Sequence, residues 1–235
     1  MAGSGSMLQR FGDEIWIADG PNVMSMGFRY PSRMTIIRLD DGTLFVWSPV
    51  AMNATLKAEV EALGTVKHVV APNSLHHVFL GEWASAFPDA HLYAAPQLRS
   101  KCPEIKFDHD LGDVAPDAWV REIDQVAVPG NAITTEVVFF HKKSATVLFT
   151  DLIQQFPEDW FSGWRRFVAK WDLMVSREAT VPRKFRIAFT DRKLACAALR
   201  RILEWPADKV LMAHGAPVMT DGRNQIARAF AWLKP

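Results

Sequence analysis

Apolar and polar positions alternate over short stretches in the first third of the chain. Residues 15–18, 34–39 and 43–47 are rich in β-branched and aromatic side chains and have the length of strands. Asp40, Asp41 and Gly42 lie between the last two stretches and have the composition of a hairpin turn. The pattern predicts that the fold opens with antiparallel strands.

A helical period then replaces the strand period. Leu56, Val60 and Leu63 are spaced to form the apolar face of a helix over 53–63, and an apolar strand over 67–71 follows it. A second helix, over 78–87, is expected to end before Pro88 and to lead into a strand over 91–95. Strand, helix and strand in this order predict parallel pairing beside the antiparallel opening.

The second half repeats strands and then helices. Residues 152–186 are rich in Trp and Phe but poorly periodic, and we expect loops and short helices there over one face. The other expected elements are strands over 120–128, 136–140, 146–150 and 209–213, and helices over 190–203 and 221–233. Helices would then cover both faces of two mixed sheets, which is a four-layer αββα sandwich in the α/β class.

Composition narrows the possible partners. Lys and Arg number 27 against 26 Asp and Glu, and this balance gives no electrostatic reason for a nucleic-acid partner. The longest apolar runs are strand-sized, so we expect no membrane span and no membrane partner. Cys102 and Cys196 form no paired motif, which favours a reduced, cytoplasmic setting. Residues 1–6 have the composition of an expression scar, and 7–235 of one domain.

Candidate chemistry lies just after three of the apolar strands. His76 and His77 follow the strand at 67–71, Asp151 follows the strand at 146–150, and His214 follows the strand at 209–213. Strand ends are where α/β folds place their sites. Neutral imidazole and carboxylate are ordinary zinc and iron ligands. These four residues are therefore the candidate ligands of one Zn or Fe ion, with an alternative in which no metal is bound.

The motifs around these positions resemble those of the metallo-β-lactamase superfamily, and the resemblance covers nearly all of residues 7–235. That family has H-x-H-x-D-H after a strand, a later Pro-Gly-His, a Leu-Phe-x-Gly-Asp and a final strand ending in histidine. This chain has the corresponding segments Pro72-Asn-Ser-Leu-His-His, Pro129-Gly-Asn, Leu148-Phe-Thr-Asp and Met212-Ala-His-Gly. The resemblance implies the αββα fold, in an uncharacterised branch of the superfamily.

Carried over by position, the resemblance implies an incomplete ligand set. The three histidines of one metal position fall on Pro72, Ser74 and Asn131. The other position keeps His77, Asp151 and His214, and His76 replaces its aspartate. The resemblance therefore implies at most a mononuclear site.

The leading hypothesis is a metallohydrolase that acts on a small-molecule ester, thioester, lactone or phosphoester. Asp151, Ser74 and Asn131 are then the catalytic candidates, and the substrate-binding candidates are Asn73, Arg29, Tyr30, Arg33 and Trp160. The resemblance implies that Arg29, Tyr30 and Arg33 lie in a loop that can border the cavity. The first alternative is a noncatalytic, metal-free binding module on the same fold, and the second is an iron-dependent oxidoreductase. The sequence leaves the choice among them open, along with the oligomeric state.

Overall fold

The first sheet occupies the N-terminal half of the chain. The computed structural model describes residues 7–234, so the expected scar at 1–6 lies outside the described residues. Seven strands pair in sequence order: β1 (Gln9–Gly12), β2 (Ile15–Ser25), β3 (Phe28–Arg38), β4 (Thr43–Trp47), β5 (Thr65–Ala71), β6 (His91–Ala94) and β7 (His109–Asp110). Pairing is antiparallel up to β4 and parallel from β4 to β7, which confirms a mixed sheet.

The second sheet has four strands and is also mixed. They are β8 (Ile123–Val128), β9 (Glu136–His141), β10 (Thr146–Phe149) and β11 (Lys209–Met212), in the spatial order β11-β10-β9-β8. The β10 and β11 pair is parallel, and the other two pairs are antiparallel. Both sheets therefore present the carboxyl ends of parallel strands at an edge where polar loops can meet.

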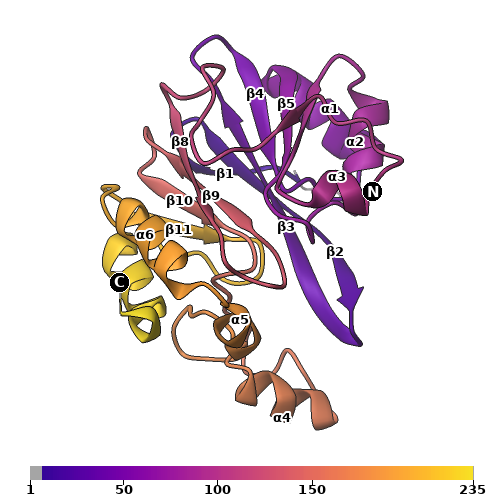
Figure 1. Cartoon of the computed structure of the whole chain (residues 1–235). Helices are drawn as coiled ribbons and strands as arrows, with labels where there is room; N and C mark the ends of the chain where they lie inside the picture. Colours follow the sequence, from indigo (N-terminus) through magenta and orange to yellow (C-terminus); the bar gives the residue numbers. More distant parts are fainter. Residues whose placement is uncertain (1–6, 235) are drawn as a thin grey trace.

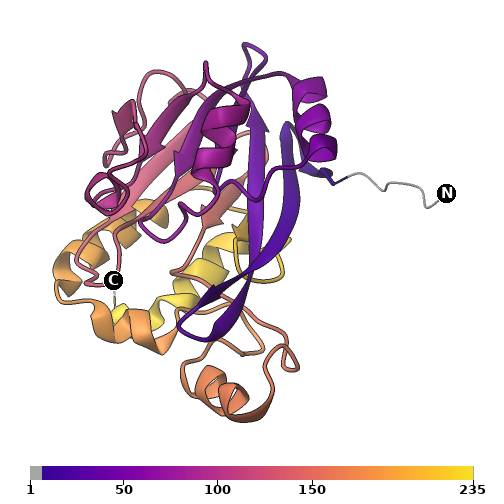
Figure 2. The same ribbon diagram turned by 90° about the vertical axis from the view of Figure 1, so that its right-hand side faces the viewer.

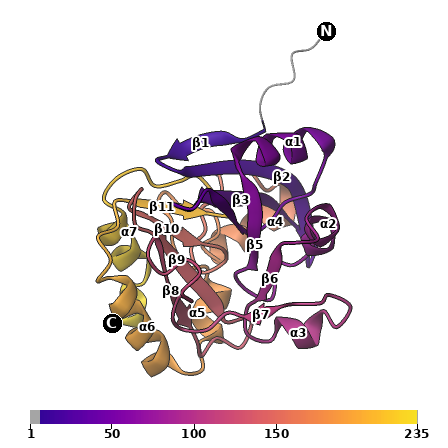
Figure 3. The ribbon, with the colours of Figure 1, turned by 90° about the horizontal axis from the view of Figure 1, so that it is seen from above.

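Helices cover the outer faces of the two sheets (Figures 1 and 3). The helices are α1 (Ala54–Leu63), α2 (Leu80–Ala86), α3 (Leu98–Lys101), α4 (Gly163–Trp171), α5 (Arg183–Ala188), α6 (Arg192–Ile202), α7 (Gly222–Ala229) and the 3-10 helix Ala231–Leu233. Helices α1 and α2 pack on the first sheet, and α6 and α7 pack on the second. The expected four-layer αββα sandwich is confirmed.

The alternation of side chains along each strand explains how a sheet can pack on helices with one face and on the other sheet with its second face. In β4, Leu44 and Val46 face the helices, whereas Phe45 and Trp47 face the second sheet. Phe45 meets Phe139 of β9 there, with ring centroids 5.5 Å apart. Successive strand side chains point to opposite faces, so a strand buried on both faces must be apolar throughout.

A long β-hairpin departs from the expected pattern. Strands β2 and β3 each have 11 residues and continue beyond their neighbours to a turn at Met26 and Gly27 (Figures 1 and 2). The prediction stopped β2 at residue 18 and began β3 at residue 34, because Gly20, Pro21 and Pro31 are typical of loops. The structure places these residues in a twisted two-stranded ladder whose register shifts between Gly20 and Val23.

The hairpin end packs on the Trp-rich segment. Phe28 contacts the rings of Phe161 and Trp164, with centroids 5.5 and 5.7 Å away, and Arg165 donates to the carbonyl of Gly27. Helices α4 and α5 confirm that short helices occupy this region, although they were not located from the sequence. In the view of Figure 1, the end of the hairpin and the Trp-rich segment lie together below the two sheets.

The boundaries of most other elements agree closely with those predicted from the sequence. The hairpin turn at Asp40–Gly42 is confirmed by a hydrogen bond from Leu39 N to Thr43 O and by the positive φ of Gly42. The expected strand at 120–128 begins later, at Ile123, because Val120 closes a turn on Pro116. None of the helices described within 7–234 has the length and apolar run that crossing a bilayer requires.

Candidate metal centre

Three side chains from three strand ends converge at one point between the sheets. His76 lies in the turns after β5, Asp151 follows β10, and His214 follows β11. His76 Nε2 is 3.2 Å from Asp151 Oδ2, and His214 Nε2 is 3.5 Å from Asp151 Oδ1. One donor atom from each residue lies within 4.8 Å of the other two. Within the described residues this is the group of His, Cys, Asp and Glu side chains that could hold a metal ion.

The outer nitrogen of each imidazole has a partner of its own. Ser48 Oγ is 2.8 Å from His76 Nδ1, and His214 Nδ1 donates to the carbonyl of Pro31 at 2.6 Å. Such contacts fix ring orientation and tautomer, and metal-binding histidines usually have them. With Nδ1 bonded to Pro31, Nε2 is the His214 nitrogen that faces Asp151. Burial lowers the pKa of His76, against the opposing effect of Asp151, and so favours the neutral imidazole that a metal requires.

Asp151 is held by amides on its other side. Asn73 Nδ2 donates to Asp151 Oδ2 at 2.8 Å, and Gln154 Nε2 donates to Oδ1 at 3.3 Å. Burial acts to raise the pKa of Asp151, but the hydrogen bonds and charge of His214 and His76 outweigh it and hold the pKa well below its usual range. Asp151 is therefore a carboxylate at neutral pH, able to bind a cation.

Glu136 fixes the chain that carries Asp151. Its carboxylate accepts hydrogen bonds from the backbone N–H groups of Thr150, Asp151 and Leu152, at 2.7, 2.8 and 3.0 Å. Burial, and then the nearby charge of Asp151, raise the pKa of Glu136 to about 7 in spite of these donors. Glu136 is therefore a positioning residue, because it holds the backbone that turns at the end of β10 and carries Asp151.

The three converging side chains open onto a cavity of about 260 Å³. Its wall is mainly apolar, and two lysines, Lys101 and Lys184, lie at its edge. The apolar residues of the wall are Val23, Met24, Pro49, Leu75, Val78, Phe79 and Phe185. An apolar cavity with a few convergent polar groups is the usual form of a small-molecule site.

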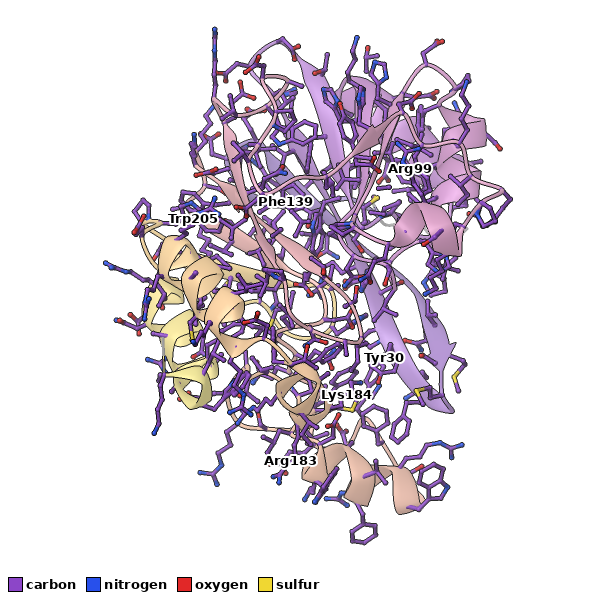
Figure 4. The ribbon with its side chains drawn as sticks, viewed as in Figure 1. Tyr30, Arg99, Phe139, Arg183, Lys184 and Trp205 are labelled. Atoms are coloured by element: carbon purple, nitrogen blue, oxygen red, sulfur yellow. The ribbon has the colours of Figure 1, made fainter. Side chains whose placement is uncertain are left out.

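Tyr30 and Lys184 line the same cavity and add polar atoms to its wall. Lys184 Nζ donates to the Tyr30 hydroxyl at 2.8 Å and lies 3.9 Å from the Asp172 carboxylate (Figure 4). The Tyr30 ring contacts the edge of the His214 ring, with centroids 5.3 Å apart. Burial raises the pKa of Tyr30, so its hydroxyl stays protonated, and in the structure it donates to Met174 Sδ at 4.0 Å.

Four other candidates from the sequence lie outside the group of three converging side chains. His77 lines the cavity but does not join the three converging side chains, because the turn directs its neighbour His76 inward instead. Ser74 is buried and bonds to Thr134 Oγ1 at 3.0 Å. Asn131 is buried and donates to the carbonyl of Phe185 at 2.9 Å. Ser74, Asn131 and the fully buried Asn73 bond within the protein and are not among the residues lining the cavity.

Three of the substrate-binding candidates lie on or against the hairpin. Arg29, Tyr30 and Arg33 belong to strand β3, which corrects the expectation that they occupy a loop. The Arg29 guanidinium lies 4.6 Å from the Trp160 ring centroid, and Trp160 Nε1 donates to the carbonyl of Arg29. Arg33 bonds to Asp19 at 2.7 Å and to the carbonyl of Met212 at 3.1 Å. Of the three β3 residues, only Tyr30 lines the cavity beside the candidate centre.

Sequence reasoning did not select Ser48, Pro31 or Lys184 for this site. Ser48 Oγ and the Pro31 carbonyl act on imidazoles 28 and 183 positions away in the chain. Contacts across such separations leave no local pattern to read. Glu136 differs, because it lies in a strand that is otherwise mostly apolar and buried. A buried carboxylate requires hydrogen-bond donors close by, so its position in the sequence indicates a structural or functional role.

A comparison with protein families and curated sequences gives one match. The profile of a family described as a domain of unknown function, DUF4336, matches residues 12–162. That segment includes His76 and Asp151 but ends before His214. No curated protein sequence matches the chain.

Solved structures similar to this chain include several metallo-β-lactamases. The enzyme from Pontibacter korlensis superposes with a TM-score of 0.63 at 12% identity, over 97% of this chain and 98% of that one. The enzyme from Erythrobacter litoralis with beta-mercaptoethanol in its active site gives 0.66 at 13%, over 97% and 95%. FIM-1 from Pseudomonas aeruginosa in its mono-zinc form gives 0.64 at 14%, over 97% and 94%. At these identities the likeness establishes the fold.

Proposed function

The chain belongs to the DUF4336 family, a domain of unknown function on the metallo-β-lactamase fold, and from that premise we propose that it is a hydrolase with a single metal site. The observation that carries the proposal is the convergence of His76, Asp151 and His214 on one point at the base of a cavity. Three protein ligands with one open position are the usual set of a catalytic zinc.

The donor chemistry of the three residues fits a zinc or iron ion. Two imidazole nitrogens and one carboxylate oxygen face one another, and the outer nitrogens are held by Ser48 and Pro31. A bound ion would act as a Lewis acid and would lower the pKa of a bound water to roughly 7. The mono-zinc form of FIM-1 shows that a member of this fold is found with one zinc.

The rest of the cavity defines what a substrate must offer. Tyr30, held by Lys184, presents a hydroxyl that can donate to a carbonyl or phosphoryl oxygen. Leu75, Val78 and Phe79 supply an apolar wall for an acyl or alkyl group and exclude water. These features suit a small ester, thioester, lactone or phosphoester. Asp151 acts as a ligand in this proposal, with Ser74 and Asn131 shaping the neighbouring loops.

Elemental analysis tests the metal directly. Protein purified without chelators is expected to contain about one Zn or Fe per chain, and Asp151→Ala and His214→Ala are expected to lose it. The control is His77→Ala, which changes a cavity histidine outside the converging group and is expected to keep the metal. No metal in the native protein, or retention in both ligand variants, would reject the proposed site.

Hydrolysis tests the reaction. Native protein is screened against p-nitrophenyl esters, an acyl thioester, a lactone and p-nitrophenyl phosphoesters. Asp151→Ala is expected to abolish any activity found, and Tyr30→Phe to lower kcat by roughly tenfold or more through loss of a hydrogen-bond donor. Equal rates in native and Asp151→Ala protein would exclude this site as the source of the activity.

A metal-free binding module is the second candidate, and one contact favours it. His76 Nε2 lies 3.2 Å from Asp151 Oδ2, so the buried carboxylate has a partner without any ion. This candidate predicts no stoichiometric metal and a thermal stability that chelators leave unchanged. The third candidate, an iron-dependent oxidoreductase, predicts iron in the purified protein together with colour or oxygen-dependent spectra.

A further inference from the structure

Helix α4 carries apolar side chains on the face it turns to solvent. Trp164, Phe167, Val168 and Trp171 have exposed fractions of 57, 76, 40 and 62%. Their spacing of three and four residues places them on one stripe, and Ala169 is the buried residue of the helix. An apolar stripe of a surface helix normally faces the core, so this orientation is reversed.

The tip of the β2–β3 hairpin extends this surface. Met24 and Met26 are 63 and 95% exposed, and Arg165 of α4 donates to the carbonyl of Gly27 in the same turn. Figures 1 and 2 show α4 and the hairpin tip at the same end of the molecule. We call the six side chains Met24, Met26, Trp164, Phe167, Val168 and Trp171 the apolar end patch.

Basic side chains surround the apolar end patch. Arg165 lies over the Trp164 ring at 4.8 Å, and Arg183 over the Trp171 ring at 5.1 Å. Arg166 and Lys170 are further exposed cations on α4 itself. Residues 157–187 contain seven Lys and Arg against four Asp and Glu, whereas the whole chain is nearly balanced at 27 against 26. This segment therefore has more basic than acidic residues, and four of its cations lie on or beside α4.

We propose that the apolar end patch binds the surface of an anionic lipid bilayer. Aromatic and Met side chains on one face, with Arg and Lys beside them, are the composition of helices that lie in a membrane interface. The cations attract anionic headgroups while the apolar side chains enter the acyl boundary. The proposed binding is to the surface of the bilayer, so it requires no membrane-spanning segment.

Charge and shape favour a bilayer over a second copy of the chain. A two-fold contact places the same patch on both copies, so Arg165, Arg166 and Lys170 would meet their own like charges. The patch is also built from a helix and a hairpin tip that lie together at one end of the fold (Figure 2). The sequence leads us to expect no membrane partner because its apolar runs are too short to span a bilayer, and the exposure of the α4 side chains cannot be read from the order of residues.

Vesicle flotation with the full chain tests the proposal. The protein is expected to float with vesicles of equal parts phosphatidylcholine and phosphatidylglycerol, to bind phosphatidylcholine vesicles much less, and to dissociate at high salt. Failure to bind the mixed vesicles, or equal binding to both kinds, would overturn it.

Substitutions at exposed positions locate the binding surface. Phe167→Asp combined with Met26→Asp is expected to abolish flotation. Arg166→Gln and Lys170→Gln are each expected to lower the partition coefficient roughly fivefold. The matched controls are Val114→Asp, at an exposed valine between β7 and β8, and Arg223→Gln on α7, and both should bind like the native chain. Native flotation of the patch variants would contradict the proposal, as would a native dimer that Phe167→Asp dissociates.

Discussion

Asn73 Nδ2 donates a hydrogen bond of 2.8 Å to Asp151 Oδ2, although the two residues lie 78 positions apart in the chain. One follows a strand of the first sheet and the other a strand of the second. The carboxamide oxygen of Asn73 also accepts from the backbone N–H groups of Leu75 and His76. A single buried amide therefore fixes the positions of two of the three converging side chains.

Asn73→Ala is expected to weaken metal binding without removing any ligand. The loss of an outer contact typically costs about 10- to 100-fold in metal affinity. The variant should also be less stable by about 1 to 3 kcal/mol, because buried donors lose their acceptor. Competition titration against a chelator and denaturant unfolding measure the two effects. Ser74→Ala is the control, since the Ser74 hydroxyl bonds to Thr134 and not to a ligand, and an unchanged affinity in Asn73→Ala would disprove the role.

Added metal is expected to stabilise the native protein against heat. At a free metal concentration about 100 times the dissociation constant, the gain is about 2.7 kcal/mol. For a chain of this length that gain raises Tm by roughly 5 to 10 °C. Calorimetry of chelator-treated protein with and without zinc measures the shift. Asp151→Ala should show none, and a similar shift in that variant would assign the binding to another place.

Gly215→Ala is expected to lower the free energy of unfolding by about 1 to 3 kcal/mol. Gly215 has φ +145°, and an added Cβ would lie 2.4 Å from the carbonyl oxygen of Gln155. Gln155 N also donates to the carbonyl of His214, so relief of the clash would displace the ligand segment. Gly81→Ala in α2 is the matched control, because its Cβ would meet open space. Equal stability of the two variants in urea would refute the steric argument.

Histidine 141 is expected to make the protein acid-sensitive. Burial lowers the pKa of His141 to about 4 from an ordinary value of 6.5. The unfolded chain therefore takes up a proton at a higher pH than the folded one, and stability falls as pH drops from 6.5 to 4. The loss from this group is at most about 3 kcal/mol.

His141→Asn keeps a polar side chain beside Ser144 and is expected to flatten this pH dependence. The measurement is the urea midpoint between pH 7 and pH 4. His109→Asn, at an exposed histidine, is the control and should keep the native slope. A variant at position 141 with the native slope would show that other groups set the acid sensitivity.

The layered fold could be predicted because most elements carry a clear period. Helix α1 and strands β4 and β5 follow directly from apolar spacing, since each buries a continuous face. The outer half of the β2–β3 hairpin could not be predicted in this way. It is half exposed and contains Gly20 and Pro31, and its strands are held by each other and by α4 instead of by core packing.

The candidate centre could be predicted in part for a related reason. Asp151 and His214 follow buried strands directly, so the strand ends coincide with these candidate positions. The choice between His76 and His77 depends on a turn that Asn73 sets through two backbone hydrogen bonds, and adjacent residues give no pattern to decide it. Helix α4 lies in a segment that is poorly periodic as a whole, and the sequence does not show that its aromatic residues face solvent.

The separation of the converging side chains in the chain has a consequence for folding kinetics. His214 depends on Pro31, 183 positions earlier, and Asp151 on Asn73, 78 positions earlier. Contacts of such long range form late, after the loop-closing entropy has been overcome. On the proposed metal site, an ion would bind only after both sheets have packed together. It would therefore slow unfolding and leave the rate of folding unchanged.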